Sequence, residues 1–302
     1  MKFVTFDDGN GASALGILRE DGVVAVKDLA ENLPAGLAAA VSGARDVGDV
    51  AGIPGLLPAL AEALAVVPEV AATPSDSLRL LSPILHPSRV IGVGLNYRSH
   101  AEEQGAKLPR QPILFAKWGG SVVGPDSLVA IPYSGAQVDY ECEVTVVIGR
   151  GGRDIPAATA LDHVFGVTAM NDLSDRAAQL AERQWTRAKS FDGFTPLGPT
   201  VVTLDEIPNV GRLGLSTTLN GELVQKGDTS DLIFDIPTLV AFASQGTTLR
   251  PGDVIATGTP SGVGFVKAPP VYLKAGDVVT VTVEHVGSLT TTIGPVPDGA
   301  SS

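Results

Sequence analysis

The sequence predicts an α+β fold that is mainly β, and three observations support this class. Among 302 residues there are 35 glycines and 22 prolines, which suit turns and are poorly tolerated inside helices. Beyond residue 80, short apolar runs of strand length alternate with turn residues. The sequence has no glycine-rich dinucleotide fingerprint and no regular strand–helix alternation, so a parallel doubly wound sheet is not expected. The prediction is therefore a mixed, mainly antiparallel β architecture.

The first part of the chain, residues 1–75, is predicted to form a small N-terminal α/β module. Apolar runs bounded by turn residues indicate its strands, and leucines at helical spacing indicate its helices. These two strands and two helices are expected at residues 2–6, 22–26, 37–41 and 56–67. The segment 72–76, with a proline and small polar residues, is typical of a linker.

The remainder, residues 80–297, is predicted to form one larger domain in which strands dominate. Strands are expected at residues 90–93, 113–116, 144–148, 164–167, 213–219 and 278–283. Two longer stretches have helical composition, at residues 174–184 and 236–244.

Charge and cysteine content exclude several classes of function. The net charge is −12, which leaves no basic surface for nucleic acid or for an anionic membrane. No apolar window is long and charge-free enough to span a membrane, and the first residues lack a signal-peptide stretch. Cys142 is the single cysteine, so we expect no disulfide, an inert buried thiol, and a cytoplasmic location.

Three acidic residues lie where strands are predicted to begin or end. In a strand, Glu141 and Glu143 point to the same face, where two adjacent carboxylates repel unless water or a cation neutralises them. Asp172 follows another predicted strand and is either a helix-start acid or a third oxygen ligand. Three carboxylates would suit a hard ion such as Mg²⁺ or Mn²⁺. A solvated strand face stays an open alternative.

Three further segments carry candidate chemistry. Lys189 lies in an apolar, turn-rich stretch, where a buried lysine would need an anionic partner. His100 and Glu103, at i and i+3 of a short helix, are close enough to pair as a general base. The glycines of residues 257–264 would let backbone amides approach an anion. Each segment read alone also fits a structural role, as a surface lysine, a surface pair or a plain turn.

The order of the motifs is more specific than any one of them. The chain contains V-G-x-N-Y-x-x-H, D-Y-E-x-E, N-D-x-S-x-R-x-x-Q, Q-W-x-x-x-K-S-F-D and T-G-T-P-x-G-V-G, in that sequence. Over about residues 80–295 this arrangement resembles the fumarylacetoacetate hydrolase family. The resemblance implies a mixed β-roll catalytic domain, a divalent metal (Mg²⁺ or Mn²⁺), a small anionic 2-oxo acid substrate and a homodimer.

The resemblance also implies roles for individual residues. It implies metal ligands at Glu141, Glu143 and Asp172, and catalytic residues at His100, Glu103 and Lys189. Implied substrate contacts are Tyr97, Arg176, Gln179, Gly258 and Thr259. Three carboxylates, a divalent ion and Lys189 sum to zero charge, so an anionic substrate would meet no large repulsion. Where the family commonly has Ser-Ala-Arg-Asp, this chain has an acid before Arg176 and none after it, which leaves the orientation of Arg176 open.

The activity first expected is hydrolysis of a C–C bond in an acylpyruvate-like 2,4-dioxo acid. It would pass through a metal-stabilised enolate, with His100 and Glu103 activating water. The alternative is an isomerase or decarboxylase acting on a 2-oxo or 2-hydroxymuconate-type diacid, because the same enolate serves those reactions. A lesser alternative is a non-catalytic ligand-binding homologue.

Overall fold

The computed structural model describes residues 1–66 and 72–300, and its largest sheet has eleven strands. Most neighbouring strands are antiparallel, whereas β18–β5 and β14–β7 are parallel. The spatial order of the main path is β3 (Gly22–Ala25), β2 (Ser13–Arg19), β1 (Lys2–Asp7), β14 (Thr195–Thr203), β12 (Val164–Asn171), β10 (Cys142–Ile148), β18 (Val254–Ala256), β5 (Val90–Gly94) and β6 (Ile113–Lys117). Off this path, two short strands pair with β1 and β14, namely β4 (Leu80–Leu81) and β7 (Val122–Val123).

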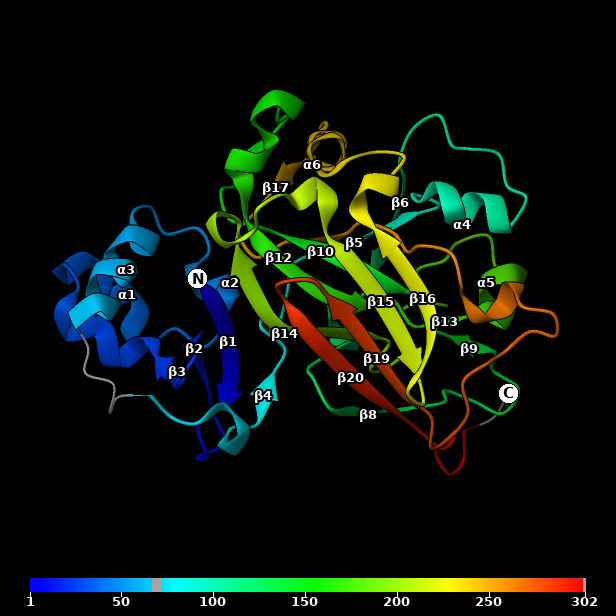
Figure 1. Cartoon of the computed structure of the whole chain (residues 1–302), viewed down its shortest axis with the longest axis horizontal. Coiled ribbons are helices and arrows are strands. Elements are labelled where there is room, and N and C mark those ends of the chain that lie inside the picture. Colours follow the sequence, from blue (N-terminus) through cyan, green and yellow to red (C-terminus); the bar gives the residue numbers. More distant parts are fainter. Residues whose placement is uncertain (67–71, 301–302) are drawn as a thin grey trace.

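A second sheet packs against the first, in front of it in Figure 1. Its five strands, in spatial order, are β16 (Glu222–Asp228), β15 (Gly214–Leu219), β19 (Val278–Val283), β20 (Gly287–Gly294) and β8 (Ser127–Ala130). Two short ladders complete the β structure, β11 (Gly152–Arg153) with β17 (Thr248–Leu249) and β9 (Val138–Asp139) with β13 (Ser174–Asp175).

Three α-helices lie in the N-terminal module and three in the rest of the described chain. The first three are α1 (Ala35–Ser42), α2 (Val47–Val50) and α3 (Leu56–Val66), and the others are α4 (Arg98–Glu103), α5 (Arg176–Ala181) and α6 (Ile236–Ser244). Asp235 begins α6 by accepting a hydrogen bond from the backbone N–H of Thr238, which satisfies one of the free donors of the first turn. No helix in the described ranges is long and apolar enough to cross a membrane.

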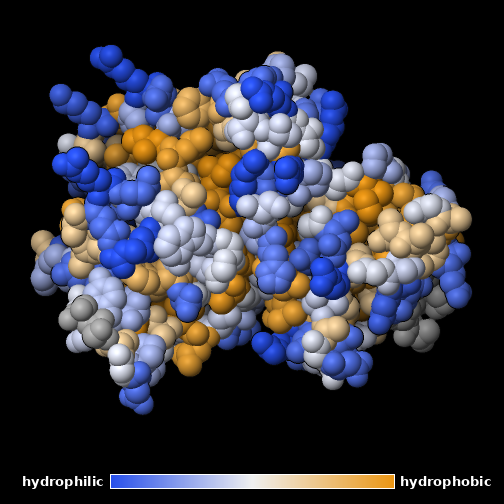
Figure 2. Space-filling view, turned by 180° about the vertical axis from the view of Figure 1, so that it is seen from behind, coloured by the Kyte–Doolittle hydropathy of each residue, from blue (hydrophilic) through white to orange (hydrophobic). Residues whose placement is uncertain are grey.

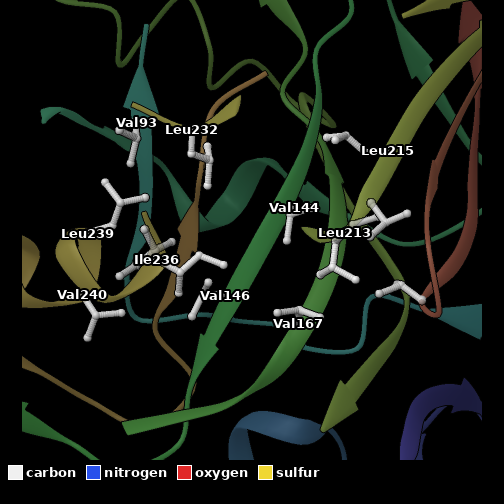
Figure 3. Close-up of a cluster of buried hydrophobic side chains, with 14 of the residues drawn as sticks. Val93, Val144, Val146, Val167, Leu213, Leu215, Leu232, Ile236, Leu239 and Val240 are labelled. Carbon is white, nitrogen blue, oxygen red and sulfur yellow. The ribbon is translucent and has the colours of Figure 1, made fainter. Parts of the chain in front are cut away.

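The main hydrophobic core lies between the two sheets and α6. Figure 3 shows Val144 and Val146 of β10 among side chains from α6 and β15, such as Leu239 and Leu215. A second core covers the N-terminal module and includes Phe3, which contacts Phe165 with ring centroids 5.4 Å apart. These two cores bury both faces of the central strands, which explains why β10 is apolar at nearly every position from residue 144 onward.

The structure confirms the fold class, and most predicted elements are present. Among the longer strands, β2, β14, β16 and β20 were not predicted. In β2 the central residues Ala14–Ile17 are all buried and do not alternate. The helix expected at 174–184 is the shorter α5, because Ser174 pairs with Asp139 of β9 and Asp175 caps the helix instead of entering it. The helix expected at 56–67 is α3, whose last predicted residue, 67, lies outside the described residues.

The N-terminal module joins the rest of the molecule through hydrogen bonds as well as packing. Lys2 and Phe3 of β1 pair with Val202 and Val201 of β14, so the blue strands of Figure 1 extend the same sheet that holds β10 and β12. This continuity places the module on the edge of the sheet beyond β14, so that two strands, β14 and β12, lie between it and β10.

Candidate functional site

The three candidate metal ligands meet where the first residues of β10 lie beside the last residues of β12. The strands are antiparallel, with Cys142 opposite Asn171 and Glu143 opposite Met170. The backbone N–H of Asp172 donates to the carbonyl oxygen of Glu141 over 2.8 Å. One carboxylate oxygen from each of Glu141, Glu143 and Asp172 lies within 4.8 Å of the others, and all three side chains are buried. The sheet register therefore gathers residues that are 31 positions apart in the sequence.

Two buried lysines neutralise part of this acidic cluster. Lys189 Nζ lies 2.8 Å from Glu141 Oε2 and 2.6 Å from Asp172 Oδ2. Lys117 Nζ, at the end of β6, lies 2.5 Å from Asp172 Oδ1 and donates to the carbonyl oxygen of Phe194. Burial disfavours both ammonium ions: it lowers the pKa of Lys117, whereas for Lys189 the attraction of Asp172 and Glu141 outweighs burial and raises the pKa.

Lys117 was missed from the sequence. It follows an apolar run typical of a strand, and that run gives no sign of a buried partner 55 residues away. The expected charge balance counted Lys189 alone. The structure brings three cations together here, Lys117, Lys189 and Arg176. The carboxylates are four, because Asp139 joins Glu141, Glu143 and Asp172. The formal charge before any metal binds is therefore −1.

Glu143 differs from the other two acids because no ion pair holds it within the described part of the chain. Its Oε2 accepts a hydrogen bond from the backbone N–H of Gly258 over 2.7 Å, and the side chain is buried. Burial, followed by repulsion from Asp172 and Glu141, raises its pKa well above the usual range. In contrast, Lys189 and Arg176 overcome the effect of burial and lower the pKa of Glu141. A buried carboxylate without a cation fits a site built for a divalent ion.

Arg176, the first residue of α5, reaches back to the same cluster. Its Nη2 lies 2.7 Å from Glu141 Oε1 and 2.9 Å from Asp139 Oδ2, and its Nη1 donates to Gln179 Oε1. The open question about its orientation is answered by Asp175, whose carboxylate turns away to Tyr133 and to backbone N–H groups. Asp139, and not Asp175, is the aspartate that pairs with Arg176.

The predicted pair on α4 is present and oriented by further contacts. His100 Nδ1 lies 2.6 Å from Glu103 Oε1, and Glu103 Oε2 accepts a hydrogen bond from the backbone N–H of Gly262. If the Nδ1 proton points to Glu103, the lone pair on Nε2 is the basic site. Gln104 Nε2 lies 2.7 Å from that nitrogen. Gln104 is a second residue missed from the sequence, since a glutamine at a helix end has no distinctive pattern.

A small cavity connects these groups. Its volume is about 80 Å³, and its walls include both His100 and the acids Glu141 and Glu143. The other lining residues are Val93, Gly94, Leu95, Gln104, Phe115, Arg176, Gln179, Trp185, Lys189, Thr259 and Phe265. Trp185 and Phe115 contact each other edge to face, with centroids 5.6 Å apart, and Lys189 Nζ lies 5.0 Å from the centroid of the Phe115 ring. The cavity thus combines a few convergent polar groups with aromatic walls, as small-molecule sites do.

Two predicted substrate contacts lie outside the walls of this cavity. Tyr97 is fully buried within the main hydrophobic core, and Gly258 directs its N–H at Glu143. Thr259 does line the cavity, where its Oγ1 accepts a hydrogen bond from Gln225 Nε2 over 2.9 Å. Gln225 also accepts from the backbone N–H of Cys142, so it links β16 to the strand that carries the acids.

Comparison with known proteins agrees with the fold and places the chain in a family. A family model described as "Fumarylacetoacetate (FAA) hydrolase C-terminal" matches residues 89–294. A mitochondrial oxaloacetate tautomerase of Xenopus laevis is 43% identical over 216 residues, covering 71% of this chain and 68% of the relative. The corresponding Homo sapiens protein is 41% identical over 225 residues, covering 74% and 72%. This chain therefore belongs to the fumarylacetoacetate hydrolase family.

Solved structures extend the similarity to nearly the whole chain. Fumarylacetoacetate hydrolase from Exiguobacterium antarcticum superposes with a TM-score of 0.82 at 35% identity, covering 98% of this chain and 99% of the other. Maleylpyruvate hydrolase from Sphingobium sp. SYK-6, in complex with manganese(II) and pyruvate, gives a TM-score of 0.79 at 28% identity, covering 98% and 100%. The relatives thus include both hydrolases and tautomerases of small organic acids.

Proposed function

We propose that this protein is a divalent-metal-dependent enzyme that cleaves a C–C bond of an acylpyruvate-like 2,4-dioxo acid with water. The observation that carries the proposal is a cavity bordered by Glu141 and Glu143 of the candidate metal site and by His100, which pairs with Glu103. Its volume of about 80 Å³ suits a short-chain acid better than a bulky one.

Glu141, Glu143 and Asp172 would hold the metal ion, because they offer hard oxygen ligands and Glu143 has no cation of its own in the described chain. When bound, Mg²⁺ or Mn²⁺ would supply Lewis-acid polarisation of the substrate's 2-oxo group. The manganese and pyruvate of the maleylpyruvate hydrolase structure support this choice of metal and ligand class.

The cations of the site would bind and orient the acid. The cluster carries a formal charge of −1, so a divalent ion raises it to +1 and favours an anionic substrate. Arg176 and Gln179 line the cavity side by side and would bind substrate oxygens. Lys189 would stabilise the negative charge that develops on the 2-oxo group as the C–C bond breaks.

His100 would act as the general base on water. Its Nε2 takes one proton while the water oxygen bonds to the C4 carbonyl carbon of the substrate. The C3–C4 bond then breaks, its electron pair stays with C3 as an enolate, and C3 takes up a proton to give the 2-oxo acid beside a carboxylic acid. Glu103 keeps the imidazole in the required tautomer and stabilises its cation, as the 2.6 Å contact indicates.

A second candidate is keto–enol tautomerisation or isomerisation of a 2-oxo diacid, to which decarboxylation is chemically related. Two observations favour it: the tautomerase names of relatives at 41% and 43% identity, and the contact of Gln104 with His100 Nε2. That contact occupies the position that a hydrolytic water would take. Tautomerisation only moves a proton and consumes no water.

The deciding experiment assays the purified protein against an acylpyruvate, oxaloacetate and a hydroxymuconate-type diacid, with Mg²⁺ or Mn²⁺ and with EDTA. Metal-dependent release of pyruvate and a carboxylic acid, without CO₂, supports hydrolysis. Enol–keto exchange of oxaloacetate without any cleavage supports the second candidate. No turnover of any of the three with metal present would contradict an enzymatic role and favour a ligand-binding one.

We also infer a homodimer, whereas the cytoplasmic location stays an expectation from the single cysteine. Apolar residues gather in patches on the face shown in Figure 2, and the exposed apolar side chains include Ile113 and Leu114 on the edge strand β6. An edge strand that pairs on one side only and exposes apolar residues favours association with another copy. Light scattering after size exclusion tests the dimer, and a monomeric mass at micromolar concentration would contradict it.

A further inference from the structure

The carboxylate of Asp139 lies beside the candidate metal site and has no role in the proposed function. It ends β9, two residues before Glu141, and its side chain is fully buried. Its Oδ1 accepts hydrogen bonds from the backbone N–H groups of Tyr140 and Gly264, over 2.9 and 2.8 Å. Its Oδ2 accepts from the N–H of Phe265 over 3.1 Å and from Arg176 Nε over 2.9 Å. One carboxylate thus joins β9, the loop after β18 and the first residue of α5.

These contacts converge on the guanidinium of Arg176. The ring of Phe265, whose backbone Asp139 holds, lies with its centroid 4.3 Å from Arg176 Cζ, a distance typical of a cation–π contact. Arg176 Nη2 lies 2.9 Å from Asp139 Oδ2 and 2.7 Å from Glu141 Oε1. Arg176 also lines the cavity, so its guanidinium is within reach of a substrate oxygen there.

The two acids beside Arg176 differ in their other partners. Glu141 also forms an ion pair with Lys189 and belongs to the candidate metal cluster. A divalent ion that draws charge from Glu141 would weaken its attraction for Arg176. Asp139 pairs with no other cation among the described residues, so its attraction for Arg176 does not depend on the metal.

We propose that Asp139 is the positioning residue that holds Arg176 and Phe265 at the cavity wall while Glu141 serves the metal ion. Arg176 can then bind the carboxylate of a 2-oxo acid at the same time as the cation is in place. The role of Asp139 rests on the proposed function in one respect, that an anionic 2-oxo acid occupies this cavity. It does not depend on which reaction follows.

Asp139→Asn tests the proposal, with Asp253→Asn as the matched control. Asp253 is also buried, also contacts an arginine (Arg89 Nη1, 3.2 Å) and also accepts from a backbone N–H (Arg250, 2.8 Å), but it lies outside the cavity. The readouts are the Kd of pyruvate in the presence of Mn²⁺, measured by calorimetry, and the Tm. Both variants are expected to lower the Tm.

Asp139→Asn is expected to weaken pyruvate binding about tenfold to hundredfold, the range for one hydrogen bond to a charged group. Asp253→Asn is expected to change it by less than about twofold. Equal affinities in the two variants, or no binding of pyruvate to the wild type, would overturn the proposal. Pyruvate binding needs no turnover, so failure to convert any 2,4-dioxo acid would count against the proposed function alone.

A second measurement covers the case in which Asp139→Asn does not fold. In the ¹⁵N spectrum of the wild type, the Nε–H of Arg176 is expected to exchange slowly with solvent, because Asp139 accepts its hydrogen bond. Addition of Mg²⁺ should leave that protection unchanged. Loss of protection with Mg²⁺ would show that Glu141, and not Asp139, holds the guanidinium.

Discussion

The two ends of strand β10 are buried to the same extent but in opposite chemical surroundings. Val144, Val146, Val147 and Ile148 pack into hydrophobic cores, where each fully buried Val or Ile contributes about 1.5–3 kcal/mol. Glu141 and Glu143, at the other end, are buried among Asp172, Lys189 and Arg176. Burial of such charges costs free energy that ion pairs recover only in part.

The contrast shows which end of the strand serves stability and which serves chemistry. A strand of this kind would be more stable with apolar residues throughout, since buried ion clusters are often replaceable by well-packed hydrophobic ones. The charged end is also the end that faces the cavity. Substitutions there should change activity and metal binding, whereas substitutions in the apolar half should change stability alone.

The largest expected effect at the charged end is on turnover. His100→Ala should lower kcat for hydrolysis by about 10²–10⁴-fold, the usual contribution of a general base. His163→Ala is the matched control, because His163 is also buried but bonds the carbonyl oxygen of Arg150 away from the cavity. Steady-state kinetics with an acylpyruvate measure both, and similar losses in the two variants would contradict the assigned role.

Removal of a cation from the charged end should destabilise the fold. Lys189→Met leaves Glu141 and Asp172 with fewer partners, and breaking a buried ion pair from one side costs about 3–5 kcal/mol. Chemical denaturation in EDTA measures the loss. Because a divalent ion would replace part of the missing charge, Mg²⁺ should restore some stability to the variant. A variant as stable as the wild type would show that the ammonium is dispensable there.

At the apolar end the expected effect is on stability without loss of function. Ile148→Ala removes a fully buried side chain from the core and should cost about 2–5 kcal/mol of unfolding free energy. KM should stay unchanged, because the residue lies at the far end of β10 from the acids. A raised KM in the folded variant would contradict the claim that the apolar end of β10 contributes to stability alone.

The smallest effect concerns Cys142, which lies between the two acids but faces away from their cavity. Burial raises the pKa of its thiol to about 12, and the side chain has no exposed surface. A thiol-specific disulfide reagent at pH 8 should therefore react much more slowly with the native protein than with the unfolded one. Rapid reaction of the native protein would mean that this part of β10 opens.

Short apolar runs bounded by turn residues were sufficient to predict β1, β3, β5, β6, β10, β12, β15 and β19, but not long strands such as β14, β16 and β20. Local spacing was also sufficient to place Glu141 and Glu143 on one side of the chain at the start of β10, because they are two residues apart. Ser174 and Asp175 were assigned to a helix because their pairing with β9 depends on a distant segment. Local pattern carries no information about such a partner.

The same limit applies to the site. Lys117 meets Asp172, and Asp139 meets Arg176, across segments that are far apart in the sequence. The family resemblance supplied the residues of the best-known motifs, and it included Tyr97, which the fold places in the core. Pairs of side chains from segments far apart in the sequence could therefore be identified only in the structure.

The central claim is that Glu141, Glu143 and Asp172 form a site for a divalent cation. A titration with Mn²⁺, followed by electron paramagnetic resonance of the free ion, tests it directly. The wild type should bind about one Mn²⁺ per chain, and Glu143→Gln, which keeps the shape of the side chain and removes its charge, should bind at least tenfold more weakly while remaining folded. Equal Mn²⁺ affinity in the wild type and in Glu143→Gln would contradict the claim.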